Sequence, residues 1–404
     1  MKYDFDEIID RTNTNSENVD GWRPYIFKCG PEKKFPYADD EFVRMWVADM
    51  EFAVAPEIRQ AIIDRVNRKI LGYTIVSDNG YYEALLKWCK DRYDWSFDKD
   101  ELVFSPGVIP ALYQLVEDLV AKDEKVLTMT PAYGFFLHSC EYNNVELVMS
   151  PLKKENGRFE IDFEDLEKKA ADPKVRLLML CNPHNPAGRI WTEDELKRIA
   201  AIVEKNDLWV VSDEIHCDLI RTGLRHIPMG KIMPDYDKLI TTMSASKTFN
   251  LAGMLFSNII IRSNEERQRF QDRDKNIGAA NPLSIAAHKA AYEHGAQWLE
   301  EMKAYIDDNF RMVDEFLGEN IPDAVFTIPE ATYFAWVDMG KVLPDVEDLP
   351  LFFANNAGVL LEGGDGLFVD NAKGYIRLNL AMPRATIRTG LERMAEAIRK
   401  HNGK

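Results

Sequence analysis

Residues 241–254, TTMSASKTFNLAGM, decide how this chain is interpreted. They continue the apolar-leaning run 238–243 (KLITTM), which is typical of a strand buried in a mostly parallel sheet. The run stops in small hydroxylated residues, and a single lysine, Lys247, follows shortly before a turn that contains Gly253. Lys247 alone is more often a solvated surface residue. Its apolar approach and serine neighbours favour a partly desolvated, reactive amine instead.

The middle of the chain extends this strand pattern on both sides. Short apolar runs alternate with amphipathic helical segments, such as 192–206, where Thr192 and Glu195 have the spacing of a capping box. Such alternation predicts a doubly wound α/β core with a mostly parallel sheet and helices on both faces. The expected strands are 101–105, 125–130, 145–150, 175–181, 208–212, 238–243 and 257–263.

The two ends of the chain differ from this alternating middle. Residues 1–50 are mixed and irregular, whereas long helical patterns over 284–317 precede short strands at 332–339 and 374–380. We therefore expect a large domain over residues 51–285. A smaller α/β domain would be formed by residues 1–50 and 286–404 together.

Composition narrows the possible functions. The 404 residues carry a net charge of −17, which argues against binding to nucleic acid or an anionic membrane because no basic excess would neutralise phosphates. Five scattered cysteines without a CxxC pattern indicate neither a disulfide framework nor a zinc site, and we expect no metal. No signal peptide and no stretch of about 18 apolar residues is recognised. A cytoplasmic location is therefore expected.

Polar features directly follow four of the expected strands. They are the segment 105–110 (SPGVIP), Asn182, Asp213 and Lys247. Each has an ordinary explanation alone: the segment as a strand–helix turn, Asn182 as a turn cap and Asp213 as part of a helix N-terminus. In open α/β sheets, however, ligands bind beyond the carboxyl ends of the strands. The fold would bring all four features to one edge.

Together these features satisfy three requirements of one cofactor. An imine-forming lysine, a buried acid that keeps a ring nitrogen protonated and a backbone site for a phosphate describe a site for pyridoxal phosphate. Ser244 and Ser246 add small hydroxyl groups suited to the phosphate. Pyridoxal 5′-phosphate is therefore the expected cofactor.

At this point the chain resembles fold-type I pyridoxal-phosphate enzymes of the class I/II aminotransferase superfamily. More narrowly, it resembles their MalY/PatB group of cystathionine β-lyases, which are C–S lyases. The resemblance covers nearly the whole chain, and its ordered set of motifs is highly specific. The matching segments are 45–52 (MWVADMEF), 72–74 (GYT), 105–112 (SPGVIPAL), 131–133 (PAY), 182–191 (NPHNPAGRIW), 212–219 (SDEIHCDL), 244–253 (SASKTFNLAG) and 376–384 (IRLNLAMPR).

The resemblance implies roles around the cofactor ring. Lys247 would form the imine, and Asp213 would pair with the pyridine nitrogen. Asn182 would donate a hydrogen bond to the phenolic oxygen, with His216 near that oxygen. Tyr133 would stack on the ring, so that Lys247, Asp213 and Tyr133 are the expected catalytic residues.

It also implies contacts to the phosphate and the substrate. Arg377 would bind the α-carboxylate of an amino-acid substrate, for which its planar guanidinium is suited. Tyr73 would reach the phosphate of a neighbouring subunit, which implies a homodimer with shared active sites. The phosphate contacts within one chain would be the backbone of Val108 and Ile109, together with Ser244 and Ser246.

Three positions depart from the pattern of the group. Glu51 stands where the group usually has aspartate, and Leu255 stands where related enzymes often place a polar or basic residue near the phosphate. The segment 133–144 is less rich in proline than in the group and is expected near the substrate entrance. The substrate itself is therefore left open.

The function implied is β-elimination from L-cystathionine or related S-substituted cysteines, which releases a thiol, pyruvate and ammonia. The alternative is an aminotransferase acting on an amino acid and a 2-oxo acid, because both reactions start with the same proton abstraction by Lys247. A third possibility is a cofactor-binding regulator. The intact set of Lys247, Asp213, Asn182 and Arg377 argues against it.

Overall fold

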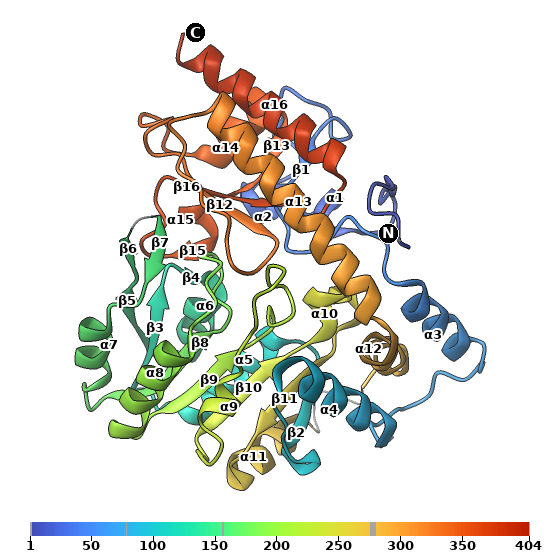
Figure 1. The fold of residues 1–404 in the computed structure, drawn as a ribbon, viewed down its shortest axis with the longest axis vertical. Coiled ribbons are helices and arrows are strands. Elements are labelled where there is room, and N and C mark those ends of the chain that lie inside the picture. Colours follow the sequence, from blue (N-terminus) through green and yellow to red (C-terminus); the bar gives the residue numbers. More distant parts are fainter. Residues whose placement is uncertain (1, 78, 156, 275–279, 404) are drawn as a thin grey trace.

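The computed structural model describes residues 2–77, 79–155, 157–274 and 280–403. A seven-stranded sheet forms its centre, in the order β2–β11–β10–β9–β8–β3–β5 (Figure 1). Strand β11 is antiparallel to both neighbours, whereas the other neighbouring strands are parallel, so the expected mostly parallel sheet is confirmed. The strands are β2 (Leu102–Ser105), β3 (Lys125–Thr130), β5 (Glu146–Pro151), β8 (Val175–Cys181), β9 (Trp209–Asp213), β10 (Leu239–Met243) and β11 (Ser257–Ile261).

Helices cover both faces of this sheet. Along β8, Leu177 and Met179 belong to the buried cluster beneath α5 (Val108–Leu119), α6 (Gly134–Asn143) and α11 (Asn264–Asp274). Leu178 and Leu180 belong instead to the cluster beneath α7 (Phe163–Ala170), α8 (Glu193–Lys205) and α9 (Met229–Ile232). Successive side chains of a strand point to opposite faces, so a strand apolar on both faces is buried on both.

A smaller antiparallel sheet lies above the central one in Figure 1, in the order β12–β16–β14. Beside it, β1 from the N-terminal segment pairs in parallel with β13, so both ends of the chain contribute to this region. The division at residues 51 and 285 remains a prediction, because the largest buried cluster runs across both limits. The elements are β1 (Val43–Arg44), β12 (Phe334–Asp338), β13 (Val359–Leu360), β14 (Glu362–Gly363), β16 (Tyr375–Asn379), α13 (Ala296–Asn320), α14 (Leu349–Ala357) and α16 (Arg384–His401).

The helical pattern expected over 284–317 is divided at Gly295 into α12 (Pro282–His294) and α13. A Cβ atom at position 295 would lie 2.3 Å from the ring of Phe249. Phe249 ends the short helix α10 (Ala245–Thr248), which carries Lys247. This close approach holds the α12–α13 junction against the lysine segment.

Over the described ranges, no helix has both the length and the apolar character needed to cross a membrane. The remaining elements connect the layers described above. They are α1 (Glu17–Asp20), α2 (Trp22–Ile26), α3 (Pro56–Val66), α4 (Asn79–Tyr93), α15 (Gly364–Leu367), β4 (Ala132–Tyr133), β6 (Lys153–Glu155), β7 (Arg158–Glu160) and β15 (Phe368–Val369), with the 3-10 helices η1 (Lys99–Glu101) and η2 (Ala252–Met254).

Candidate active site

Three of the expected site residues lie at the carboxyl ends of adjacent strands. Asn182 follows β8, Asp213 ends β9 and Lys247 lies just beyond β10. The backbone N–H of Asn182 donates to the carbonyl of Asp213 at 2.9 Å, and Thr242 of β10 is directly opposite Asp213 in the ladder. Parallel pairing of the three strands therefore brings these side chains to one edge of the sheet.

The amine of Lys247 is held by the N-terminal segment. Its Nζ donates a hydrogen bond of 2.7 Å to the carbonyl oxygen of Ala48, which also accepts from the hydroxyl of Tyr333 at 3.0 Å. Burial lowers the pKa of Lys247 to about 8, against the opposing attraction of the Asp49 carboxylate. A larger fraction of this amine is therefore neutral near physiological pH than for an exposed lysine.

Asp213 is buried and lacks a cationic partner in contact. One carboxylate oxygen accepts hydrogen bonds from the N–H of Ile215 at 3.2 Å and the hydroxyl of Thr242 at 3.4 Å. Burial raises the pKa of Asp213 to about 6 because the charged form is desolvated. Among the described residues, no lysine or arginine forms an ion pair with Asp213, so a protonated ring nitrogen fits beside it.

Asn182 and His216 present buried polar atoms that the described part of the chain leaves without partners. The Asn182 amide donates to the carbonyl of Ile227 at 3.0 Å, but its Oδ1 accepts no hydrogen bond there. The Nδ1 atom of His216 is likewise unpartnered. Burial lowers the pKa of His216 to about 3, so the ring is neutral. Unpartnered buried polar atoms are rare, and these two fit a polar ligand at the strand ends.

The start of α5 offers the backbone groups expected for the phosphate. Val108 and Ile109 occupy its first turn, where backbone N–H groups have no acceptor within the helix. Ser244 is more constrained than the sequence suggests, because its hydroxyl donates to the carbonyl of Phe256 at 2.8 Å and accepts from the N–H of Ser246 at 3.1 Å. The Ser244 hydroxyl proton is therefore already donated to a backbone carbonyl and is not free for a phosphate.

Two residues expected near the phosphate, Tyr73 and Leu255, are exposed in the single chain. The side chain of Tyr73 is fully exposed, in the segment between α3 and α4. Leu255 is 65% exposed and has a left-handed backbone with φ of 50°. Both remain predictions, and that for Tyr73 depends on a second chain.

Arg377 lies on β16 and is almost fully buried. Its Nη2 donates to the carbonyl of Trp46 at 3.0 Å, whereas Nε and Nη1 have no partner among the described residues. The guanidinium lies 4.0 Å from the ring centre of Phe334 and 5.4 Å from that of Phe368. A buried arginine packed against aromatic rings, with two donor atoms unpartnered, is suited to bind a carboxylate.

Tyr133 approaches the same region from the large sheet. It pairs with Phe368 across the two-stranded ladder of β4 and β15, and the two rings lie 6.3 Å apart. Burial raises the pKa of Tyr133 well above its ordinary value, so its phenol stays protonated. The ladder thus joins Tyr133 to the ring that also contacts Arg377.

The structure gives a role to the segment 45–52, to which the sequence assigned no function beyond its match to the family. The carbonyl of Trp46 accepts from Arg377, and that of Ala48 accepts from Lys247. Asn379 donates to the carbonyls of Val47 at 2.7 Å and Asp49 at 2.5 Å. Residues 46–49 therefore set the distance between Lys247 and Arg377.

Glu362 is a second residue near the site that the sequence did not indicate. It is 4% exposed on β14, directly opposite Arg377 in the ladder. Burial raises the pKa of Glu362 to about 7, and the charges of Arg377 and Lys28 oppose this shift. No pattern in the glycine-rich segment around it signals a buried acid, since only the strand pairing brings it beside Arg377.

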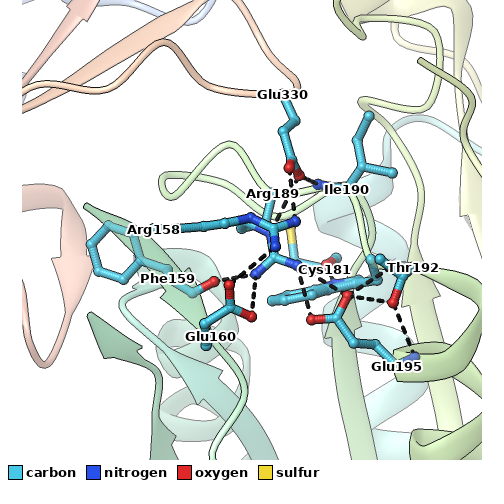
Figure 2. Close-up of polar contacts among 10 residues, drawn as sticks. Arg158, Phe159, Glu160, Cys181, Arg189, Ile190, Thr192, Glu195 and Glu330 are labelled. Carbon is cyan, nitrogen blue, oxygen red and sulfur yellow. Dashed lines mark hydrogen bonds and ion pairs between the residues drawn. The ribbon is translucent and has the colours of Figure 1, made fainter. Parts of the chain in front are cut away.

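Arg189, from the motif 182–191, forms a buried charged cluster beside the site (Figure 2). Its guanidinium donates to Glu195 at 2.9 and 3.0 Å, to Glu160 at 3.1 Å and to Glu330 at 3.3 Å. Glu330 also accepts from Arg158 at 2.8 Å and from the N–H of Ile190 at 2.9 Å. The cluster joins β7 and α8 to the segment that leads into β12.

We expect Arg189→Met to lower the free energy of unfolding by about 3 kcal/mol, because three carboxylates would lose their shared buried cation. Urea unfolding monitored by tryptophan fluorescence measures this change. Lys197→Met on α8 is the matched control, since its pair with Glu193 is exposed to solvent and contributes little to stability. Equal stability of both variants would refute the role of the cluster.

Comparisons with known proteins identify the family of the chain. The family model for aminotransferase class I and II matches residues 41–394. Cystathionine beta-lyase PatB of Bacillus subtilis is 35% identical over 357 residues, covering 88% of this chain and 92% of that protein. Protein MalY of Escherichia coli is 28% identical over 400 residues, covering 98% of this chain and 99% of that protein.

A solved structure extends the comparison to the fold. The PLP-bound C–S lyase of Staphylococcus hominis is 46% identical, with a TM-score of 0.93 over 98% of both chains. The resemblance drawn from the motifs and the expected fold-type I architecture are thus both confirmed. The chain therefore belongs to the aminotransferase class I and II family.

Proposed function

We propose that this protein is a pyridoxal-phosphate-dependent C–S β-lyase that cleaves L-cystathionine or related S-substituted cysteines. The observation that carries the proposal is the partly desolvated Lys247 amine at the same sheet edge as buried Asp213. The names of PatB and of the 46% identical C–S lyase support elimination over transamination, and they confirm the predicted enzyme class and cofactor.

Different residues of the chain bind the substrate, remove its Cα proton and hold the cofactor ring. Arg377 binds the α-carboxylate of the substrate through its free Nε and Nη1 donors, and this fixes the Cα–H bond relative to Lys247. The Lys247 amine removes the Cα proton as a general base. Bound pyridoxal phosphate supplies the electron-withdrawing ring that stabilises the negative charge at Cα. Asp213 keeps the ring nitrogen protonated. Nδ1 of His216 is free to donate to the ring oxygen, whereas the unpartnered Oδ1 of Asn182 can only accept a hydrogen bond, and the Asn182 amide N–H already donates to Ile227.

The sulfur–carbon bond at Cβ then breaks, and the sulfur leaves as a thiol. With one water molecule, the rest of the substrate becomes pyruvate and ammonium, so no external oxidant or reductant is needed. The neutral ring of His216 and the protonated Tyr133 keep further charge away from the reacting centre. The proton removed by Lys247 can be returned or lost to solvent.

A product assay tests this function directly. Purified protein with added pyridoxal phosphate is mixed with L-cystathionine and, separately, with amino acids plus 2-oxoglutarate. We expect pyruvate and free thiol in equal amounts from cystathionine, without glutamate. Glutamate without thiol would establish the aminotransferase alternative and overturn the lyase.

We further propose a cytoplasmic homodimer with shared active sites. The segment between α3 and α4 exposes Ile70, Leu71, Tyr73 and Ile75, which is an unusual apolar group for a free surface. A second copy of the chain would cover these side chains. It would also bring Tyr73 to the phosphate-binding turn of its partner.

Tyr73→Phe removes one hydroxyl and leaves the apolar segment intact. We expect it to weaken retention of pyridoxal phosphate about 10-fold, the effect of losing a hydrogen bond to a charged group. Cofactor release during dialysis measures the effect, with dimerisation followed by light scattering. Tyr142→Phe, at another exposed tyrosine, is the control. Unchanged retention in Tyr73→Phe would exclude the phosphate contact.

A further inference from the structure

One face of the small sheet presents three buried polar side chains in a row. Arg377 of β16 is directly opposite Trp336 of β12 on one side and Glu362 of β14 on the other. Directly opposite residues of antiparallel strands project to the same face. The three side chains are therefore neighbours, and their residues are 7% exposed or less.

Each member of this row has a polar atom without a partner in the described part of the chain. These atoms are Nε1 of Trp336, Nε and Nη1 of Arg377, and Oε1 of Glu362. No ion pair within 4 Å joins Arg377 and Glu362, although they are adjacent in the ladder. Three successive unsatisfied residues are exceptional in a folded protein. The row combines donors for a carboxylate with an acceptor for a cation or N–H group.

The unpartnered oxygen of Glu362 does not bind the amine of Lys247. The amine of Lys247 donates to the carbonyl of Ala48, and no hydrogen bond or ion pair joins it to Glu362 in the described part of the chain. Lys247 therefore does not neutralise Glu362 by contact.

Glu362 lies beside the expected substrate-binding residues, because it is directly opposite Arg377. The Arg377 guanidinium lies 5.4 Å from the Phe368 ring, which packs 6.3 Å from Tyr133. The charge of Glu362 contributes to raising the pKa of both Tyr25 and Tyr133, and Tyr133 belongs to the expected ring-binding set. Lys28 does not neutralise it by contact, because the Lys28 amine donates to the carbonyl of Tyr25 at 2.8 Å. The carboxylate thus remains available to a ligand.

We propose that Glu362 is a specificity-determining residue that binds an ammonium or other N–H group on the leaving-thiol portion of the substrate. This inference rests on the proposed β-lyase function and names the substrate class within it: S-substituted cysteines whose sulfur substituent carries a positive charge. A cation of this kind would form the direct ion pair that no described residue forms with the buried carboxylate.

Three substrates of similar size separate the charge effect from the chemistry. They are S-(2-aminoethyl)-L-cysteine, S-propyl-L-cysteine and S-carboxymethyl-L-cysteine, which are cationic, neutral and anionic at the substituent. We expect kcat/KM of the wild type to be about 10-fold or more higher for the cationic than for the neutral substrate, as for a hydrogen bond between charged groups.

Glu362→Gln should reduce this preference to about twofold or less, with little change for the neutral substrate, because the amide keeps the shape and loses the charge. Glu362→Asp, which keeps the charge, should retain part of the preference and covers the case in which the glutamine variant misfolds. Glu347→Gln, an exposed acid of the same region, should behave as the wild type.

Several outcomes would overturn the inference. One is the same ratio of kcat/KM for the cationic over the neutral substrate in the wild type and in Glu362→Gln. Another is an equal loss of kcat/KM in Glu362→Gln for all three substrates, which would mean that Glu362 only positions Arg377. Thiol release from all three substrates without charge preference in the wild type would remove the role of Glu362 and leave the lyase intact. Absence of thiol from every substrate would refute the lyase function and this inference together.

Discussion

We expect Lys247→Ala to lower the rate of pyruvate and thiol release by about 10³-fold, because it removes the general base of the proposed reaction. It also removes the covalent attachment point of the cofactor. The amine of Lys247 is held by the carbonyl of Ala48, and burial lowers its pKa to about 8. Steady-state assays of both products measure the loss, and the visible absorption band of the bound cofactor should disappear.

A matched lysine distinguishes this effect from general damage. Lys205→Ala on α8 removes an exposed amine that pairs with Glu167, and it should leave both activity and absorption unchanged. Borohydride reduction followed by peptide mapping identifies the lysine that carries the cofactor. A cofactor still fixed by borohydride in Lys247→Ala would assign the attachment to a different lysine.

Asp213→Asn is expected to slow exchange of the substrate Cα proton by about 10² to 10³-fold, as for loss of a preorganised charge at a reacting centre. The neutral amide can still accept the N–H of Ile215, so the fold is expected to persist. The carboxylate, in contrast, would no longer favour a protonated ring nitrogen. Proton exchange in deuterated solvent, followed by nuclear magnetic resonance, measures the step without depending on thiol release.

Asp207→Asn is the control for this substitution. Asp207 precedes β9, is exposed and pairs with Lys238, so its loss should alter neither exchange nor cofactor binding. Circular dichroism checks that both variants are folded. Full exchange activity in Asp213→Asn would refute the pairing with the ring nitrogen.

Much of the large sheet was predictable because its strands are apolar on both faces. The expected strands 175–181, 208–212 and 238–243 correspond to β8, β9 and β10, and their limits agree within one residue. Parallel strands share one carboxyl edge, so the convergence of Asn182, Asp213 and Lys247 followed from the order of strands and helices alone. The cofactor could be inferred from residue types at that edge.

The contacts that complete the site could not be predicted in this way. Residues 46–49 act through backbone carbonyls, which carry no residue-specific signal, and they hold Lys247 and Arg377 from a distant part of the sequence. The hydrogen bond from the Ser244 hydroxyl to the backbone carbonyl of Phe256 could likewise not be predicted from a sequence motif. Tyr73 is fully exposed in the single chain, and its predicted phosphate contact requires a second copy.

The sequence by itself determined the α/β class, the family resemblance and the lysine that carries the chemistry, because local periodicity and residue type express these properties directly. Only the tertiary structure decided that Glu362 stands beside Arg377 with an unpartnered oxygen. The physical reason is that strand register places side chains on a shared face, and burial then removes the water that would have satisfied them.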